Sequence, residues 1–260
     1  MTWRSGIITL TTDFGAAETY VGVVKGVILN IFSGATIVDL THQIDPQDVP
    51  GATWALMDVV PYFSERTVHV AVVDPGVGSE RRAIALFSGG QFFVGPDNGV
   101  FTPFFEEAES IVELNREEIF LENVSPTFHG RDIFAPVAAN LAKGMKPPEI
   151  GDQITDPVTI RIPRAKAEGN TIKGEVVQID RFGNVITNIP VKMLPRNAAV
   201  IVEVCDVKVD GLAACYSAIE TEQVAALEGS SGRVEIAVRE GSAAETLSAS
   251  AGDEVVIRKM

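Results

Sequence analysis

The chain has few histidines and cysteines, the side chains that bind zinc, and too few cysteines for a disulfide framework. Its 260 residues include two cysteines and three histidines. Cys205 and Cys215 stand ten positions apart in an apolar, strand-like stretch, which predicts two buried thiols instead of a disulfide. His42, His69 and His129 are far apart, and neither an H-x-x-x-H nor a C-x-x-C spacing occurs. We therefore expect no metal site.

Long apolar runs and clusters of basic residues are also absent. Charge or glycine interrupts every apolar run before the roughly 18 residues that a membrane span needs, and residues 1–6 lead straight into a strand instead of a signal segment. The net charge is −14, and the largest basic cluster is Arg81-Arg82. A nucleic-acid footprint is therefore missing, and we expect a soluble, cytoplasmic protein that binds neither membranes nor nucleic acid.

Strand-like and helix-like segments alternate through the first part of the chain, up to about residue 160. Alternation of this kind predicts an α/β fold, with a mostly parallel sheet and helices on both of its faces. Asp48 is a candidate N-cap for one of the helices. The predicted strands cover 7–11, 36–40, 68–73 and 110–114, the helices 18–31, 48–60 and 131–142, and a hairpin 82–94.

The pattern changes from Thr171 onward, where nearly every segment alternates with period two between Gly, Asn and Ser turns. This predicts a small all-β barrel or sandwich, with one short helix that Ser242 begins in a capping-box pattern. We expect an α/β domain over 1–163 and a β-barrel domain over 170–260, joined by a linker at 163–169. The predicted strands cover 174–180, 184–189, 199–204, 207–211, 233–238 and 254–259.

Four carboxylates stand at or near the ends of strand-like runs in the first domain: Asp13, Asp39, Asp74 and Asp97. If these strands are parallel, the four residues lie along one edge of the sheet, where open α/β sheets bind ligands. Asp39 and Asp97 also fit the ordinary role of turn or cap residues. Asp13 precedes a Phe-Gly pair and a helix, a geometry in which a carboxylate can hold the two hydroxyls of a ribose.

The loop after the apolar run 68–73 is the most informative stretch of the chain. Its sequence is VDPGVGSERR over 73–82. Proline and glycine set up a turn that can bring Arg81 or Arg82 back toward Asp74. A carboxylate and a guanidinium would then share one cleft.

The three histidines differ in their surroundings. His129 stands in a Pro/Gly-containing loop directly before a helix, which places it near the surface of a cleft or in a plain helix-entry loop. His69 lies inside an apolar strand and is expected to be a core histidine. His42 fits either environment.

A loop in the second domain carries an acid, an aromatic ring and an amide between two strands. Asp180, Phe182 and Asn184 fit an ordinary β-turn. They also fit a ligand loop, in which Phe182 stacks on a flat base while the other two bind an ammonium or hydroxyl group.

Taken together, these motifs resemble one family over essentially the whole chain. The motifs are TTDFG (11–15), DLTHxIxP (39–46), VDPGVGSERR (73–82), GPDNG (95–99), TFHGRDIFAP (127–136), DRFGNVITN (180–188), SSGRVEIAV (230–238) and GSAA (241–244). They are similar to those of the adenosine-forming S-adenosyl-L-methionine (SAM) hydrolases, or SAM hydroxide adenosyltransferases, which are related to the SAM-dependent fluorinase and chlorinase. The resemblance implies an α/β domain joined to a β-barrel, a homotrimer with sites between subunits, SAM as substrate and no cofactor or metal.

The resemblance also implies roles for particular residues. The catalytic set of the hydrolases falls on Asp74, Arg81 and His129, and the motif favours Arg81 over Arg82. The halogenating relatives hold other residues at the positions of Asp74 and His129. Where the fluorinase places a tryptophan against the adenine, this chain has Gln47. The implied substrate-binding residues are Asp13, Asp74, Asp180, Phe182, Asn184, Ser230, Ser231, Glu235 and Val238.

The expected reaction is attack of water or hydroxide on the ribose 5′ carbon of SAM, which yields adenosine and L-methionine. His129 would either take a proton or stabilise hydroxide, and the sequence does not separate these roles. Three alternatives remain open at this point: a SAM-dependent halogenase, a metal-dependent phosphoesterase that uses the four aspartates, and a non-catalytic SAM or adenosine sensor.

Overall fold

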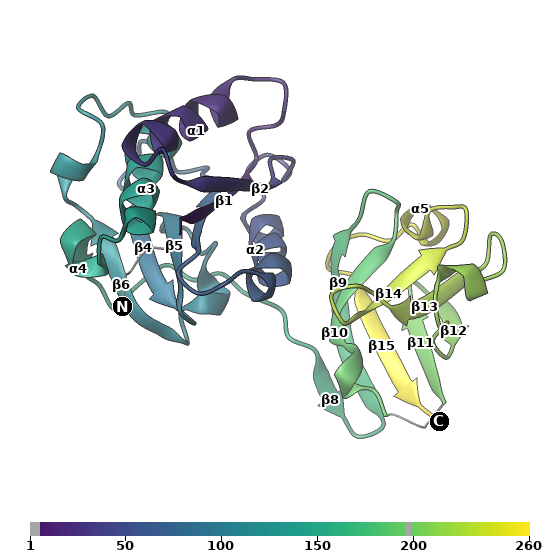
Figure 1. Ribbon diagram of the computed structural model, residues 1–260. Helices are drawn as coiled ribbons and strands as arrows, with labels where there is room; N and C mark the ends of the chain where they lie inside the picture. The colour runs from purple at the N-terminus through teal and green to yellow at the C-terminus, as the bar shows by residue number, and fades with distance from the viewer. Residues whose placement is uncertain (1–5, 196–198) are drawn as a thin grey trace. The chain divides into compact units, whose positions relative to one another are not determined.

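The computed structural model describes residues 6–195 and 199–260, and it divides into two units, the first ending at Ile162 and the second beginning at Pro163 (Figure 1). Within these ranges no helix has the length and apolar character that crossing a membrane requires. The elements of the first unit are β1 (Ile7–Thr12), α1 (Tyr20–Ile31), β2 (Thr36–Thr41), α2 (Val49–Val59), β3 (Val68–Val72), β4 (Ala83–Ser88), β5 (Gln91–Pro96), β6 (Ala108–Leu114), α3 (Ala135–Lys143), α4 (Pro147–Ile150) and β7 (Gly151–Gln153).

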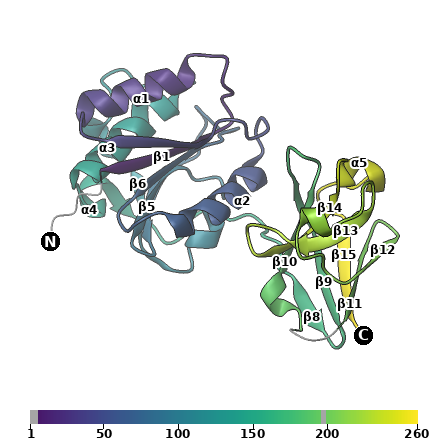
Figure 2. The same ribbon diagram turned by 45° about the vertical axis from the view of Figure 1, so that its right-hand side comes forward.

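The first unit is built on a seven-stranded sheet in the order β2-β1-β3-β5-β4-β6-β7. The neighbours β2, β1, β3 and β5 are parallel, and β4, β6 and β7 join them in antiparallel fashion. Helices α1 and α3 cover one face and α2 the other (Figures 1 and 2). The predicted α/β fold, with a mostly parallel sheet and helices on both faces, is confirmed.

Burial on both faces explains why every residue of β3 except His69 is apolar. Successive side chains of a strand point to opposite faces, so Val68, Val70 and Val72 pack under α1 and α3, while Ala71 and Val73 pack under α2. The chain leaves this central strand at Asp74, and the neighbouring parallel strands end at the same edge of the sheet.

His69 is the one polar side chain within β3 (VHVAV) and is fully buried, as the sequence predicts. Its Nδ1 lies 2.8 Å from Thr9 Oγ1 and its Nε2 lies 2.5 Å from Gln91 Oε1. Since the amide oxygen only accepts, His69 carries its proton on Nε2 and accepts the Thr9 hydroxyl hydrogen at Nδ1. Burial lowers the pKa of His69 to about 4, because a charged imidazolium would lose its hydration there.

The elements of the second unit form an antiparallel sheet in the order β12-β11-β15-β9-β10-β14-β13, with β8 added beside β9. The end strands β12 and β13 come near each other, so the sheet curls into a nearly closed barrel around an apolar core, as predicted. The bounds are β8 (Lys166–Glu168), β9 (Thr171–Ile179), β10 (Val185–Pro190), β11 (Val200–Val204), β12 (Val207–Asp210), β13 (Val224–Glu228), β14 (Arg233–Val238), α5 (Ala243–Leu247) and β15 (Glu254–Lys259).

Helix starts follow the sequence closely. Asp48 caps α2 by accepting a hydrogen bond from the backbone N–H of Gly51 at 2.9 Å. Ser242 caps α5 in the same way, accepting from the backbone N–H of Glu245 at 3.1 Å. Both N-caps confirm the predictions, because short polar side chains satisfy the free N–H groups of the first turn.

The structure corrects several local expectations. The segment predicted as a linker contains β8, since Lys166–Glu168 pairs with the start of β9. Strand β13 was not predicted, because its sequence VAALE lacks the alternation that marks a half-buried strand. The cysteines are not buried: Cys205 is half-buried in the tight turn between β11 and β12, with φ of 47°, and Cys215 is exposed.

The buried imidazole predicts a specific loss of stability in acid. In the unfolded chain His69 titrates near 6.5, whereas its pKa in the fold is about 4. Between these values the unfolded state binds the extra proton, so stability is full above pH 6.5 and falls as the pH drops toward 4. The loss attributable to this residue is about 3 kcal/mol.

Urea unfolding of wild type and His69→Gln at pH 7 and pH 4.5 measures this loss. We expect His69→Gln to be less stable at pH 7 but to lose clearly less stability on acidification than the wild type. Asn140→Gln, which changes an amide side chain without a titratable group, is the control and should keep the wild-type pH dependence. An unchanged pH dependence in His69→Gln would show that His69 is not the titrating group.

Candidate active site

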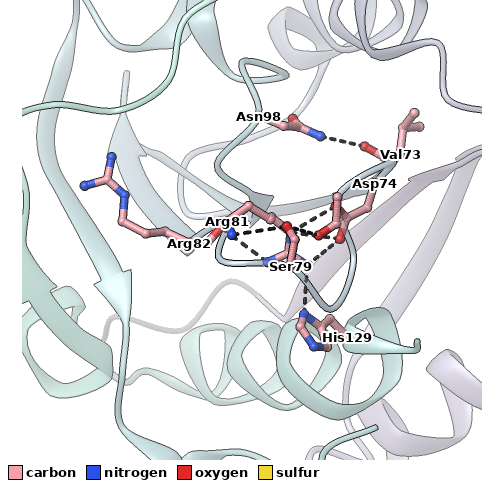
Figure 3. Close-up of polar contacts among 8 residues, drawn as sticks. Val73, Asp74, Ser79, Arg81, Arg82, Asn98 and His129 are labelled. Atoms are coloured by element: carbon pink, nitrogen blue, oxygen red, sulfur yellow. Dashed lines mark hydrogen bonds and ion pairs between the residues drawn. The ribbon is translucent and has the colours of Figure 1, made fainter. Parts of the chain in front are cut away.

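Asp74 and Arg81 form a closed ion pair across the loop that follows β3 (Figure 3). Arg81 Nε donates to both carboxylate oxygens of Asp74, at 2.9 and 3.1 Å, and Arg81 Nη2 donates to Oδ2. The side chains are only 4% and 10% exposed. A two-point contact of this kind fixes orientation as well as charge, so the Asp74 carboxylate has one preferred direction.

The loop is shaped by its own short contacts. Ser79 closes a turn, since its backbone N–H and its hydroxyl both donate to the carbonyl of Gly76. Gly78 has φ of 75°, and a β carbon there would lie 2.2 Å from the carbonyl oxygen of Pro126. The loop therefore touches the segment before His129 backbone to backbone, which only glycine permits.

His129 completes the group. It stands directly before a π-helical turn over Gly130–Phe134 that leads into α3. Its Nδ1 lies 2.8 Å from Arg81 Nη2. A guanidinium has donors only, so Nδ1 accepts, and the neutral imidazole carries its proton on Nε2.

The electrostatic environment agrees with a neutral ring. Burial lowers the pKa of His129 below its ordinary value, and the charge of Arg81 lowers it further. The carboxylates of Asp74 and Asp132 act in the opposite direction but do not prevail. At neutral pH the group therefore consists of one anion, one cation and one neutral ring.

A small pocket opens beside this group, with a volume of about 80 Å³. Such a cavity has room for a few water molecules. Phe14, Phe128 and Tyr20 pack edge to face next to it, with ring centroids 5.4 to 5.9 Å apart. The lining consists of Asp13, Phe14, Val72, Asp74, Val77, Thr127, Phe128, His129 and Gly130.

Asp13 and Gln47, two positions that the sequence singles out, are joined here. Asp13 Oδ2 accepts a hydrogen bond from the backbone N–H of Gln47 at 2.9 Å. Gln47 has φ of 68°, so its backbone turns sharply at this point. One carboxylate oxygen of Asp13 thus holds the neighbouring loop, while the residue lines the pocket.

The other two aspartates of the sheet edge have partners of their own. Asp39 binds Lys25 at 2.6 Å and lies 3.1 Å from His42 Nε2, and the lysine and His42 lower its pKa although burial opposes this. His42 Nδ1 in turn lies 2.9 Å from Thr12 Oγ1. Asp97, almost fully buried, binds Arg82. Among residues 6–195 and 199–260 no three His, Cys, Asp or Glu side chains gather as metal ligands.

In the second unit the carboxylate of Asp180 holds its own turn together. Asp180 Oδ1 accepts from the backbone N–H groups of Phe182 and Asn184, and Oδ2 accepts from the Asn184 side chain at 2.9 Å. Phe182 projects from this turn and is 78% exposed. The β-turn interpretation of the motif is confirmed, and the ligand-loop interpretation stays a prediction.

Glu235 has a partner that sequence reasoning missed. Tyr216 donates its hydroxyl to Glu235 Oε1 at 2.5 Å. Burial and the neighbouring Glu235 raise the pKa of Tyr216 to about 12, and burial raises the pKa of Glu235, with Asp180 adding to it. No flanking motif marks Tyr216, because its partner lies 19 positions away.

The structure does not bring all predicted ligand residues of this unit together. Ser230 and Ser231 lie exposed in the turn before β14, whereas Val238 ends that strand. The Val238 side chain packs in the barrel core, on the face of β14 opposite to Glu235. The side chain of Val238 is therefore a core residue, and its predicted role in substrate binding stays a prediction.

An acid, a guanidinium and an imidazole joined at the carboxyl edge of a parallel sheet have the form of a small-molecule enzyme site. Comparison with protein families identifies it further. The SAM hydroxide adenosyltransferase N-terminal domain matches residues 8–151, and the C-terminal domain of the same family matches residues 174–256. The chain belongs to the SAM hydroxide adenosyltransferase family.

Similar proteins agree with this assignment. The chain is 40% identical over 250 residues to an (R)-S-adenosyl-L-methionine hydrolase of Thermus thermophilus, which covers 91% of this chain and 93% of the relative. It is 29% identical over 212 residues to a fluorinase of an Actinoplanes species, at 70% and 71% coverage. An uncharacterized conserved protein of Thermotoga maritima has a crystal structure that matches with a TM-score of 0.90 at 38% identity, over 96% of this chain and 99% of that one.

The contact between Arg81 and His129 predicts a measurable titration shift. Replacing Arg81 by Gln removes a positive charge and leaves Asp74, which favours the imidazolium. The pKa of His129 should therefore rise toward or above its ordinary value, and NMR titration of the ring protons measures it.

His69 supplies the internal control, since its pKa should stay unchanged in Arg81→Gln. Asp74→Asn should shift the pKa of His129 the other way, because it removes a carboxylate that raises it. If Arg81→Gln left the pKa of His129 where it is in the wild type, the guanidinium would not be in contact with the ring in solution.

Proposed function

We propose that this protein hydrolyses S-adenosyl-L-methionine to adenosine and L-methionine by attack of water or hydroxide on the ribose 5′ carbon. The observation that carries the proposal is the buried contact of Asp74 with Arg81 and of Arg81 with His129 beside a water-sized pocket. Family membership and the hydrolase relatives support SAM as the substrate.

The leaving group of this reaction needs no protonation by the protein. Methionine departs from the sulfonium as a neutral thioether, so no general acid is required. One molecule of water is consumed, its oxygen becomes the 5′ hydroxyl oxygen, and one proton is released. The protein's task is to hold that water in line, about 3 Å from the carbon, and to accept or disperse its proton.

Asp74 is the proposed acceptor for the water. Its carboxylate oxygens retain lone pairs beyond those that Arg81 occupies, and the ion pair holds them in place. Asp13, which also lines the pocket, is proposed to hold the ribose hydroxyls. In this arrangement SAM and water are the only reactants, and the reaction needs no further cofactor.

His129 is proposed to stabilise the developing hydroxide instead of acting as its base. The lone pair of Nδ1 accepts a hydrogen bond from an Arg81 N–H, so this nitrogen is not free to take a proton from water. The opposite tautomer would turn an Nδ1–H toward the guanidinium, where two donors would meet. The imidazole therefore offers its Nε2–H as a donor, which suits a negatively charged oxygen.

The alternatives receive less support. A phosphoesterase would need the four aspartates to share a cation, but Asp39, Asp74 and Asp97 are each paired with a Lys or an Arg. A halogenase agrees less well with the comparisons, since the hydrolase relative is 40% identical and the fluorinase 29%. A SAM sensor would keep the binding residues and show no turnover.

The second unit is proposed to supply substrate contacts from its Asp180–Asn184 turn and from Ser230, Ser231 and Glu235. Its exposed phenylalanine offers a face on which a purine can stack. The domain bounds of 1–163 and 170–260 and the homotrimer with sites between subunits stay predictions from the sequence and its resemblance.

Incubation with SAM in ¹⁸O-labelled water tests the reaction. We expect one ¹⁸O atom in the 5′ hydroxyl of adenosine and none in methionine, with the masses measured by mass spectrometry. Asp74→Ala should slow adenosine release at least about 100-fold, and His129→Ala should reduce it less. Asp152→Ala, which removes a surface carboxylate paired with Arg116, is the matched control and should keep wild-type activity.

Each alternative has its own outcome in the same experiment. Unlabelled adenosine, or full activity of Asp74→Ala, contradicts the proposed mechanism. A 5′-halo-adenosine formed in chloride or fluoride buffer indicates a halogenase, and loss of activity with a chelator indicates a metal enzyme. SAM that binds without any product over hours indicates a sensor.

The exposed ring of Phe182 predicts a binding effect without a stability effect. Phe182→Ala should raise KM for SAM about 10-fold or more, because stacking a base on an aromatic ring contributes about 1–3 kcal/mol. Its thermal midpoint should stay within about 2 °C, since the side chain is largely in solvent. Tyr62→Ala is the control, as Tyr62 is 79% exposed in the first unit; equal KM changes in the two variants would contradict the role of Phe182.

A further inference from the structure

The catalytic loop over 74–82 crosses the end of a neighbouring strand. It leaves β3 and enters β4, and the strand order β3-β5-β4 places β5 between these two. The end of β5 and the residues directly after it, together called the Gly95–Gly99 turn, therefore lie at the sheet edge that the loop must cross. This turn contains the GPDNG motif, for which the proposed reaction has no direct use.

Asn98 of this turn forms a hydrogen bond to the residue directly before the catalytic loop. Its Nδ2 donates to the carbonyl of Val73 at 2.8 Å, immediately before Asp74 (Figure 3). Its Oδ1 accepts from the backbone N–H of Val100 at 3.2 Å. Gly95 lets the strands approach closely, since a β carbon there would lie 2.4 Å from the carbonyl oxygen of Ala71.

Asp97 of the same turn binds the residue at which the catalytic loop ends. It accepts from Arg82 Nε at 2.8 Å, and its backbone N–H donates to the carbonyl of Arg82 at 2.9 Å. The Asp97 side chain is 1% exposed, so it is a buried carboxylate matched to one guanidinium. Its second oxygen accepts from the backbone N–H of Val158 at 2.7 Å.

The contact between Asp97 and Arg82 at the end of the loop determines the directions of the Arg81 and Arg82 side chains. Arg82 extends away from Asp74, whereas Arg81 reaches it (Figure 3). Arg82 binds Asp97 and Arg81 binds Asp74, so the two neighbouring side chains point in different directions, and fixing Arg82 on Asp97 leaves Arg81 to reach Asp74. Arg81 Nη1 also donates to the carbonyl of Arg82 at 3.3 Å.

We propose that Asn98 and Arg82 are positioning residues of the reaction, which hold the two ends of the catalytic loop on the Gly95–Gly99 turn so that Arg81 meets both Asp74 and His129. This inference rests on the proposed function. Asn98 acts on the backbone that carries Asp74, and Arg82 acts on the backbone that carries Arg81. Neither side chain needs to touch the substrate.

Two conservative variants test the proposal. Asn98→Asp keeps an oxygen for Val100 but loses the donor to Val73. Arg82→Lys keeps the charge opposite Asp97 but loses the separate guanidinium hydrogen bonds to Asp97 and to the exposed Asp156. Each should lower kcat for adenosine release about 10- to 100-fold with KM changed less than about 3-fold, since a displacement of about 1 Å costs up to about 100-fold in rate. The matched controls are Asn140→Asp, which loses a donor to Pro136 within α3, and Arg116→Lys, which weakens a surface pair with Asp152; both should keep wild-type kcat.

Amide hydrogen exchange over 74–82 gives a second measurement that needs no turnover. Exchange there should accelerate at least about 10-fold in Asn98→Asp and stay at the wild-type rate in Asn140→Asp. Wild-type protein that releases no adenosine would contradict the proposed function, while the exchange result would still show whether the turn holds the loop. Folded variants with unchanged kcat and unchanged exchange would overturn the proposal, and so would control variants that lose as much kcat as the test variants. If Asn98→Asp does not fold, the kcat of Arg82→Lys decides.

Discussion

The ion pair between Asp74 and Arg81 is the contact on which the rest of the site depends. Both side chains are almost entirely buried, so either charge left alone would be costly. The same guanidinium fixes the tautomer of His129 by donating to its Nδ1. One cation therefore sets the direction of the acid and the protonation of the ring.

The sheet makes this pair possible by its topology. Parallel strands deliver their carboxyl ends to one edge, so the residues after β1, β3 and β5 meet there although they are far apart in sequence. The loop from β3 to β4 must pass over β5, which gives it a surface to rest on. A hairpin between adjacent strands would have no such support.

The sequence predicts those helices and strands that local patterns of apolar and capping residues define. The strand over Val68–Val72 follows from its run of β-branched and other apolar residues around His69, and α2 follows from its Asp48 cap. Contacts between distant residues were harder to predict. The partnership of Tyr216 with Glu235 has no local sign, and β13 has a composition closer to that of a helix. The spacing brings either Arg81 or Arg82 toward Asp74, and only the fold shows that Asp97 takes Arg82.

The close approach of Gly78 to Pro126 has a consequence for how the pocket can change shape. Because main chain meets main chain there, no rotation of a side chain can widen the gap between the acid-bearing loop and the segment before the imidazole. The acid-bearing loop and the segment before His129 can therefore separate only if the main chain itself moves. The Asp13 turn, which also lines the pocket, meets its neighbouring loop through hydrogen bonds, among them those from the backbone N–H of Gln47 to Asp13 and from the backbone N–H of Gly15 to the carbonyl of His42. The pocket thus has one wall in which main chain packs directly on main chain and another that hydrogen bonds hold in place.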